Sequence, residues 1–173
     1  MMFPRPFRPA VAVILTSLAL AAAQAAESPM NNQRLGALIQ RIDENAEGGT
    51  GFWRATVAGR TITVITDENA DRMRIISPVA RADNLDPALM LRMLQANFDT
   101  ALDARYSVAK GVLWSLYLHP LAALSDEQFL AGIGQVVNLA ASYGSTYSSG
   151  GLSFGGGDSN DLIQQLLDKG LSI

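Results

Sequence analysis

The sequence predicts an α+β fold in which helices pack on an antiparallel sheet of about five strands, in the order α-β-β-β-α-β-β-α. Three observations predict this class. Apolar residues recur at helical spacing in three segments, apolar and polar residues alternate at strand spacing between them, and short turns join the alternating segments. Without its first 26 residues the chain keeps about 150, the size of one domain with a single core.

The first helix is predicted by apolar residues at positions i, i+3, i+4 and i+7, the spacing of an amphipathic helix. These residues are Leu35, Leu38, Ile39 and Ile42. Gly48 and Gly49 follow, and we expect them to end the helical segment.

A meander of three strands comes next. The strands are expected over Trp53 to Val57, around Ile62 and Val64, and over Met73 to Ile76. The third strand places Arg72 and Arg74 on its second face, as a sheet with one solvent-facing side requires. Pro78 is expected to close it because proline cannot donate a ladder hydrogen bond.

The second helix begins at Asp86 and Pro87. Aspartate can cap the free amides, and proline at the first helical position loses no hydrogen bond. Leu91, Leu94 and Phe98 then share one face of this helix.

A second hairpin follows this helix. A short strand around Tyr106 and Val108 turns at Lys110-Gly111 into an apolar strand, Val112 to Leu118, which ends before Pro120. The second face of that strand is not uniformly polar, which suggests a surface for a partner. Its residues are Leu113, Ser115 and Tyr117.

The third helix starts with a capping box, in which Ser125 bonds forward and Gln128 bonds back. The helix is expected to run to about Tyr143 and to stop at Gly144. Its apolar face consists of Phe129, Ile133, Val136, Val137 and Ala140.

Composition divides the chain into four parts. Residues 1–26 read as a signal peptide, 27–144 as the α+β domain, 145–159 as a linker rich in glycine and serine, and 160–173 as a C-terminal amphipathic segment. The last segment is too short to be a stable helix in isolation, so we expect it to dock or to stay frayed.

The first 26 residues predict export. Arg5 and Arg8 precede a short apolar stretch, and Ala23-Gln24-Ala25 offers small residues at a signal-peptidase site. The stretch is shorter than the roughly 20 apolar residues of a membrane-spanning helix, so no stable membrane anchor is expected after removal. The predicted location is the periplasm or the exterior of the cell.

Composition excludes several classes of function. The chain has no cysteine, which removes disulfides, thiolate metal sites and thiol catalysis. Its net charge of −3 and pI near 5.0 do not favour nucleic acid as a partner. Metal binding is not indicated by a single histidine, and no cofactor is predicted.

Three short patterns resemble catalytic or metal motifs, and each has a simpler explanation. Ser107 and Lys110 match S-x-x-K, but residues three apart on a strand lie on opposite faces. The acidic residues from Asp67 to Asp71 match the opening of a calcium loop and lack the rest, which favours a polar hairpin turn. His119 lies at a strand end without a triad pattern, leaving a small hydrolase as a third and weaker hypothesis. The chain is therefore predicted not to be an enzyme.

Six residues are candidates for partner binding: Trp53, Trp114, Tyr117, Gly132, Leu162 and Leu166. The two tryptophans also fit a sheet core, where burial contributes on the order of 2–3 kcal/mol each. Gly132 and Gly134 interrupt the third helix, which indicates close approach of another element. Either an intramolecular contact or a dimer seam would explain them.

The order of elements resembles the type III secretion chaperones and the related YbjN-like proteins. The similarity spans about Asn31 to Gly144 and is most specific in the final strand, turn, strand and capped helix. The resemblance implies a single-layer antiparallel sheet that carries helices, a tendency to form homodimers, and binding of protein segments without catalysis. The export signal and the C-terminal tail depart from the chaperone pattern.

The leading functional hypothesis is an exported, non-enzymatic adaptor or chaperone-like domain. It would bind a protein segment by adding a strand to a sheet edge or by holding a helix in an apolar groove. The alternative is a periplasmic carrier of a small molecule or lipid, with a pocket between sheet and helices and the C-terminal tail as a lid.

Overall fold

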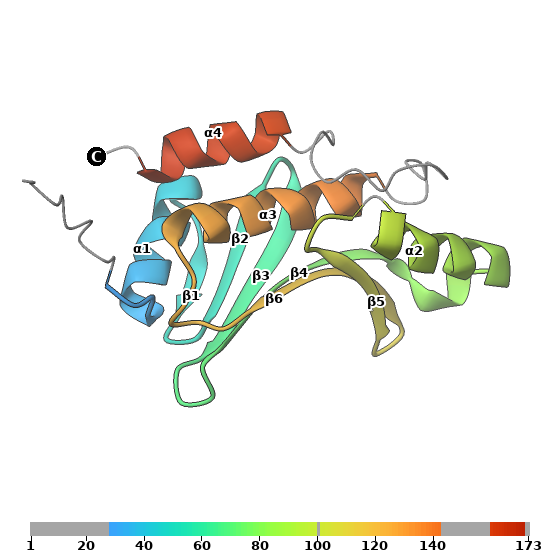
Figure 1. Cartoon of the computed structure of the whole chain (residues 1–173), viewed down its shortest axis with the longest axis horizontal. Coiled ribbons are helices and arrows are strands. Elements are labelled where there is room, and N and C mark those ends of the chain that lie inside the picture. The colour runs from blue at the N-terminus through green and yellow to red at the C-terminus, as the bar shows by residue number, and fades with distance from the viewer. Residues whose placement is uncertain (1–27, 100, 143–159, 172–173) are drawn as a thin grey trace, which may run out of the picture.

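One antiparallel sheet of six strands forms the base of the computed structural model, which describes residues 28–99, 101–142 and 160–171 (Figure 1). The strands are β1 (Glu47–Gly49), β2 (Phe52–Val57), β3 (Arg60–Asp67), β4 (Arg72–Arg81), β5 (Arg105–Ala109) and β6 (Val112–His119). The helices are α1 (Asn32–Ile42), the short 3-10 helix η1 (Ala82–Asn84), α2 (Pro87–Asp99), α3 (Asp126–Ala141) and α4 (Asn160–Leu171). The spatial order of the strands is β1-β2-β3-β4-β6-β5, which confirms the predicted α+β class.

The helices are distributed unevenly over the sheet. α1 and α3 lie against one face, α4 packs on α1 and α3 on their far side, and α2 lies beside β5 (Figure 1). We call the helix-covered side of the sheet the inner face and the opposite side the outer face. Among the described elements, no helix covers the outer face (Figure 1).

The inner face holds the core because buried and exposed residues alternate along each long strand. Its contributors on the central strands are Ile62, Val64, Met73, Ile75, Ser77, Leu113, Ser115 and Tyr117. They meet the apolar face predicted for α3, where Phe129, Ile133 and Val136 are fully buried. Burying a side chain of this size contributes about 1.5–3 kcal/mol.

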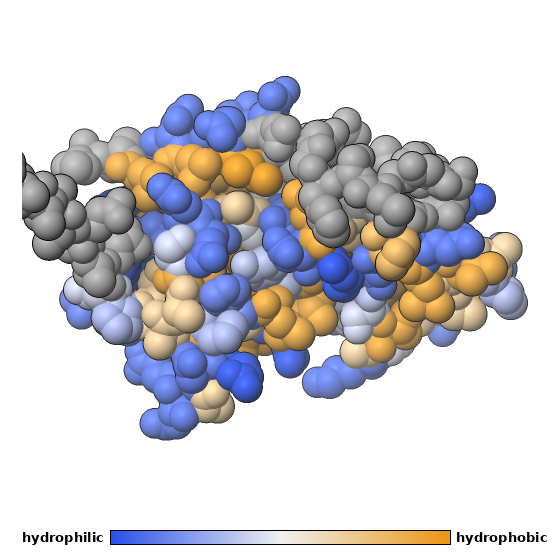
Figure 2. All heavy atoms as spheres, viewed as in Figure 1, coloured by the Kyte–Doolittle hydropathy of each residue, from blue (hydrophilic) through white to orange (hydrophobic). Residues whose placement is uncertain are grey.

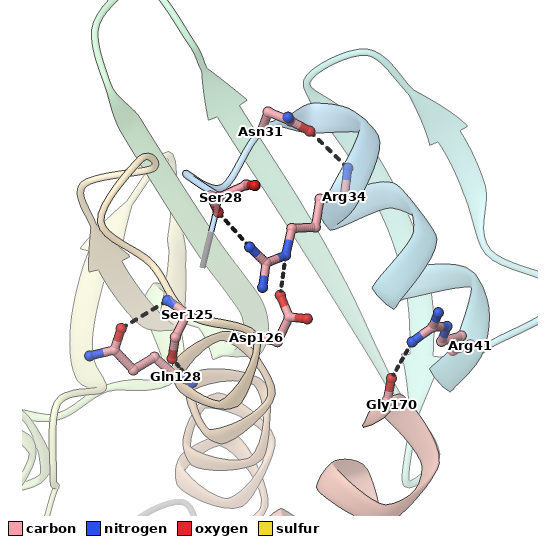
Figure 3. A network of polar contacts seen from close by, with 8 residues as sticks. All are labelled: Ser28, Asn31, Arg34, Arg41, Ser125, Asp126, Gln128 and Gly170. Carbon is pink, nitrogen blue, oxygen red and sulfur yellow. Dashed lines mark hydrogen bonds and ion pairs between the residues drawn. The ribbon is translucent and has the colours of Figure 1, made fainter. Parts of the chain in front are cut away.

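α3 begins as predicted and packs unusually close to the sheet. Ser125 Oγ accepts from the Gln128 amide at 3.1 Å, and Gln128 Oε1 accepts from the Ser125 amide at 3.0 Å, which completes the capping box (Figure 3). A Cβ at Gly132 would lie 3.0 Å from the Tyr117 ring. The glycine therefore lets α3 approach β6, which supports the intramolecular explanation.

α4 docks on the helix layer. It runs antiparallel to α3, since Gly134 meets Ile163 near the start of α4 and Gly170 meets Leu130 near its end. A Cβ on either glycine would lie 2.6 Å from the facing side chain. Both contacts therefore require glycine if α3 and α4 are to stay as close as they are. Of the two outcomes that the sequence left open for this segment, docking is the one found for residues 160–171.

Polar contacts at the helix ends reinforce this layer (Figure 3). Arg41 of α1 donates to the Gly170 carbonyl of α4 at 3.0 Å, and Lys169 donates to the Ile42 carbonyl of α1 at 2.7 Å. Each helix thus supplies a cation to the C-terminal carbonyls of the other, where the helix dipole favours positive charge. The Arg34 guanidinium also pairs with Asp126 at 2.7 Å, joining α1 to the start of α3.

Two strand predictions were wrong. β4 does not end at Pro78 but continues to Arg81. The strand pairing shifts register between Pro78 and Ala80, so the N–H group that proline lacks is not needed for a ladder hydrogen bond. Gly48 and Gly49 do not end the first helix, because α1 already ends at Ile42 with Asp43 as its C-cap. With Glu47 the two glycines form the additional edge strand β1. The positive φ of Gly48 would place a Cβ 2.2 Å from the Phe52 carbonyl, so only glycine fits this tight pairing.

α3 ends at Ala141 with Ser142 as its C-cap, just before the predicted end near Tyr143. The predicted signal peptide, the linker and the stop at Gly144 lie outside the described residues.

Candidate functional site

The outer face of the sheet is left open by the described helices (Figure 1). Strand pairing arranges its side chains in rows that run across the strands. One row is Phe52, Ile65, Arg74 and Leu118, and the next is Arg54, Thr63, Ile76, Leu116 and Arg105. Apolar side chains and arginines therefore alternate within the same surface.

Several apolar side chains of the outer face remain accessible. Phe52 is 45% exposed and Leu118 is 54% exposed, while Ile76, Trp114 and Leu116 are half-buried. Exposed apolar groups gathered in one area mark an interaction surface more often than isolated ones do. The outer face thus has the composition of a binding surface for a partially apolar ligand.

A hollow of about 530 Å³ lies at one end of this face. Its apolar lining comes from Ile65, Met73, Leu118 and Pro120, and its rim carries Asp67, Arg72, Arg74 and His119. The hollow is open rather than enclosed, so it suits a side chain or segment laid across the strands better than a fully engulfed small molecule.

α2 carries the second exposed apolar surface. Leu91, Leu94 and Phe98 are 55%, 66% and 77% exposed, whereas Met93 and Ala96 face the protein and are buried. Figure 2 shows apolar surface gathered over α2 at the right of the view. The shared face predicted for α2 thus points outward.

A cavity of about 270 Å³ lies between α2 and the hairpin of β5 and β6. Its lining is mostly apolar and includes Met93, Tyr106, Val108 and Leu113. Within the described residues this is a pocket between a helix and the sheet, as the carrier hypothesis requires.

The β5 edge is partly closed by a side chain. Asn97 of α2 accepts from the Tyr106 amide at 2.6 Å and donates to the Tyr106 carbonyl at 3.2 Å. The Asn97 side-chain amide therefore takes the place of a neighbouring strand at Tyr106. The next backbone N–H and C=O that point away from β6 belong to Val108, two residues further along β5. Because β1 at the other edge has only three residues, neither edge offers a long template for strand addition.

The six predicted partner-binding residues do not gather in one site. Trp114 lies on the outer face, half-buried, with its indole donating to the Ala109 carbonyl at 3.0 Å. Trp53 is buried against Gly36 of α1, and Gly132 packs on Tyr117. Leu162 and Leu166 belong to the side of α4 that packs on the core. Their partner-binding role stays a prediction, and of this set only Trp114 contributes to the outer face.

The face of β6 that the sequence suggested as a surface for a partner is covered by α3. Leu113, Ser115 and Tyr117 point toward α3 and are buried, and the open side of β6 is formed by the alternate residues. Those residues are Trp114, Leu116 and Leu118. Sequence reasoning named Trp114 but missed Leu116 and Leu118, although the prediction that Arg72 and Arg74 face solvent carried the signal, since both arginines share this face.

His119 is engaged by neighbouring groups of the protein itself. Its ring stacks on Tyr117 at a centroid distance of 6.2 Å, and Nδ1 lies 2.7 Å from the Pro120 carbonyl. Burial, with a smaller contribution from the Asp103 carboxylate, raises the pKa of the Tyr117 phenol above its ordinary value, so this hydroxyl stays neutral. In the described part of the chain, no three His, Asp or Glu side chains gather as metal ligands.

The acidic segment predicted as a polar turn joins β3 to β4. Asp67 accepts from the Ala70 amide at 2.9 Å, and Asp71 accepts from the Ala122 amide at 2.7 Å. Both carboxylates thus hold backbone groups of the protein itself, which confirms the turn. No helix among residues 28–99, 101–142 and 160–171 is long and apolar enough to cross a membrane.

Comparison with known proteins adds evidence on the fold. No protein-family model matches the sequence, and no curated protein matches it. Among solved structures, a chain of the HopA1–SchA chaperone–effector complex aligns with 66% of this chain and 96% of its own length, at 11% identity and a TM-score of 0.51. The Yersinia pestis type III secretion chaperone SycH, solved with a stable fragment of YscM2, aligns with 65% of this chain and 98% of its own length, at 13% identity and a TM-score of 0.50.

These identities are too low to transfer residues or partners. What the two structures share with this chain is the fold alone. The described chain therefore has the α+β fold found in the type III secretion chaperones.

Proposed function

We propose that this chain is a non-enzymatic, chaperone-like adaptor that binds a segment of another protein on the outer face of its sheet. The observation that carries the proposal is the row of accessible apolar side chains on a sheet face that no described helix covers. The similar structures support it, because both were solved as complexes of a chaperone with a protein partner.

The two edge strands of the sheet, β1 and β5, bear on how a partner segment would bind. Strand addition is disfavoured by the short β1 and by the Asn97 side chain on β5. A helix laid on the outer face needs no free edge and buries the apolar row instead. Of the two modes considered from the sequence, the structure favours the helix.

A matched pair of substitutions tests this proposal. Leu118 on the outer face is 54% exposed and Leu91 on α2 is 55% exposed, so Leu118→Glu and Leu91→Glu make the same change at equal exposure on different surfaces. A photo-crosslinking residue at Trp114 should capture specific protein segments from the native host, and Leu118→Glu should abolish that capture while Leu91→Glu leaves it intact. Equal capture by both variants would refute the outer face as the binding surface.

We also propose a homodimer formed through α2. Leu91, Leu94 and Phe98 present one exposed apolar face, and burying such side chains against a second copy contributes about 1.5–3 kcal/mol each. Sedimentation equilibrium should detect a dimer that Phe98→Glu dissociates. A monomer at all concentrations would contradict this part of the proposal.

A second candidate function is a carrier of a small apolar molecule, favoured by the cavity between α2 and the β5–β6 hairpin. Met93→Trp would fill this cavity, since Met93 lines it and is buried. An environment-sensitive apolar dye should then lose its binding to the variant. Dye binding that is unchanged by Met93→Trp would remove the cavity as the carrier site.

Location is the remaining part of the proposal. The basic start, apolar stretch and small residues of 1–26 support export of the chain to the periplasm. Cell fractionation with N-terminal sequencing should find a shortened chain outside the cytoplasm. A full-length chain in the cytosol would contradict export and would leave the binding proposal untouched.

A further inference from the structure

The charges of the outer face differ in sign from those of the whole chain. The chain carries a net charge of −3, yet this face holds Arg54, Arg72, Arg74 and Arg105. The carboxylates paired across strands with these residues come from Glu47, opposite Arg54, and Asp67, opposite Arg72. The face therefore has an excess of positive charge set among apolar side chains.

Arg74 is the centre of this arrangement. Its neighbours across the strands are Ile65 and Leu118, so no carboxylate faces it in its row. Arg74 is exposed and takes part in no ion pair in the described part of the chain. A guanidinium with its stem on apolar neighbours and its fork in solvent is suited to bind a carboxylate in a bidentate manner.

The other arginines of the outer face differ in how many hydrogen bonds they already make within the protein. Arg105 donates to backbone carbonyls, including that of Ala104 at 2.7 Å, and Arg72 donates to the Asp71 carbonyl at 2.9 Å. Arg54 faces Glu47 across the β1–β2 pair but forms no ion pair within the described residues. Arg54 and Arg74 are thus the two guanidinium groups best placed to receive outside carboxylates.

The size of the surface fits a short helix. Phe52 and Leu118 are separated by three strand intervals, or about 14 Å at ~4.8 Å per interval. A helix rises about 1.5 Å per residue, so roughly ten residues cross this distance. The hollow lined by Ile65, Arg74 and Leu118 lies along this path and offers room for apolar side chains of such a helix.

From these observations, and resting on the proposed function, we infer the chemistry of the partner: an amphipathic helix whose apolar side chains lie over Phe52, Ile65 and Leu118. Its carboxylates pair with Arg74, which lies between Ile65 and Leu118 in the same row, and with Arg54 in the next row. Charge complementarity distinguishes this partner from a basic segment. The carboxylates of Glu47 and Asp67 at the margins would oppose the dense negative charge of a lipid surface, which favours a discrete peptide over a membrane.

Two designed helical peptides test this inference on the full chain. Both carry the same leucine stripe over about three turns, and the flanking positions hold glutamate in one and lysine in the other. Fluorescence anisotropy should show that the glutamate peptide binds about tenfold more tightly than the lysine peptide. Its affinity should fall as salt is raised, because partly exposed ion pairs are screened.

Charge reversal identifies the site. Arg74→Glu should weaken the glutamate peptide about tenfold and strengthen the lysine peptide. Lys110→Glu is the matched control, since it changes the net charge equally at the exposed turn between β5 and β6 and should leave both affinities within about twofold. In a Trp53→Phe variant Trp114 is the remaining tryptophan, and its emission should shift on binding because it lies on the outer face.

The outcomes separate this inference from the proposed function. Equal affinity for both peptides, or equal effects of Arg74→Glu and Lys110→Glu, overturns the acidic partner, while crosslinking that depends on Leu118 still supports the adaptor. Anionic phosphatidylglycerol vesicles that bind in an Arg74-dependent manner, without any preference between the peptides, overturn it in favour of a membrane. Loss of both peptide binding and Leu118-dependent crosslinking refutes both proposals.

Discussion

Replacing Gly134 with alanine tests how α4 is held on α3. Alanine gains about 1 kcal/mol over glycine inside a helix, so on propensity alone the substitution stabilises α3. The new Cβ, however, would lie 2.6 Å from Ile163 Cγ1 and 3.5 Å from Ile163 Cα, well inside ordinary contact. Cγ1 is close to the α4 backbone and cannot swing far, so α4 itself must shift. Overpacking of this kind costs about 1–3 kcal/mol.

The two effects act on different equilibria. The propensity gain stabilises α3 and the global fold, whereas the clash is relieved when α4 alone leaves the surface. We therefore expect α4 amides to exchange with deuterium about tenfold to a hundredfold faster, which corresponds to ~1.4–2.8 kcal/mol of easier local opening. The free energy of global unfolding should stay within about 1 kcal/mol of the parent chain.

A double-mutant cycle isolates the contact. Ile163→Ala removes the clashing atom, so Gly134→Ala should add little to the α4 exchange rate in that background, with an interaction energy of about 1 kcal/mol or more. Hydrogen exchange with mass spectrometry measures all four chains. Unchanged or slower α4 exchange in Gly134→Ala would refute the reasoning, because it would show that the close contact does not hold α4 in place.

Three further predictions concern the sheet edge, the cap and pH. Asn97→Ala should cost about 1–3 kcal/mol in urea unfolding, since it removes the two hydrogen bonds that Asn97 makes to the Tyr106 backbone, and light scattering should show more self-association through the opened β5 edge; no change in either would contradict the capping role. Ser125→Ala should cost about 1 kcal/mol by loss of the α3 N-cap, whereas Ser125→Gly should cost only a few tenths. The pKa of Tyr117 is raised in the folded state above its unfolded value of 10.0. The free energy of unfolding should therefore be unaffected by this group below pH 10.0 and should fall as the pH rises above that value. Tyr117→Phe should flatten that decline in alkaline unfolding curves, and an equally steep decline in the variant would contradict the assignment.

The elements of the fold follow from the sequence where one physical signal dominates. The helical stripe of α1, the Asp86 cap of α2 and the capping box of α3 each depend on neighbours within four residues. Pro78 and Gly48 misled because their effect depends on pairing with a distant strand. A proline at a register shift costs no hydrogen bond, and a glycine such as Gly48 can pair within an edge strand.

The binding surface was harder to predict for a related reason. Both faces of β6 are apolar, with Leu113 and Tyr117 on one and Trp114 and Leu118 on the other, so alternation alone does not say which face α3 covers. Periodicity likewise grouped Leu91 with Phe98 without showing that this face of α2 points outward. The choice between faces is made by tertiary packing, which a local pattern does not contain.

The docking of α4 also has a consequence for the order in which the chain acquires its structure. Residues 142–159 separate α3 from α4, so during synthesis α1, the sheet and α3 leave the ribosome before their α4 cover does. Until then Leu130 and the surface around Gly134 face solvent, and the nascent chain presents an apolar strip that the finished protein hides. A stall or cleavage between α3 and α4 would prolong that state. A chain without α4 should then aggregate through the uncovered strip while the rest of the domain is still folded.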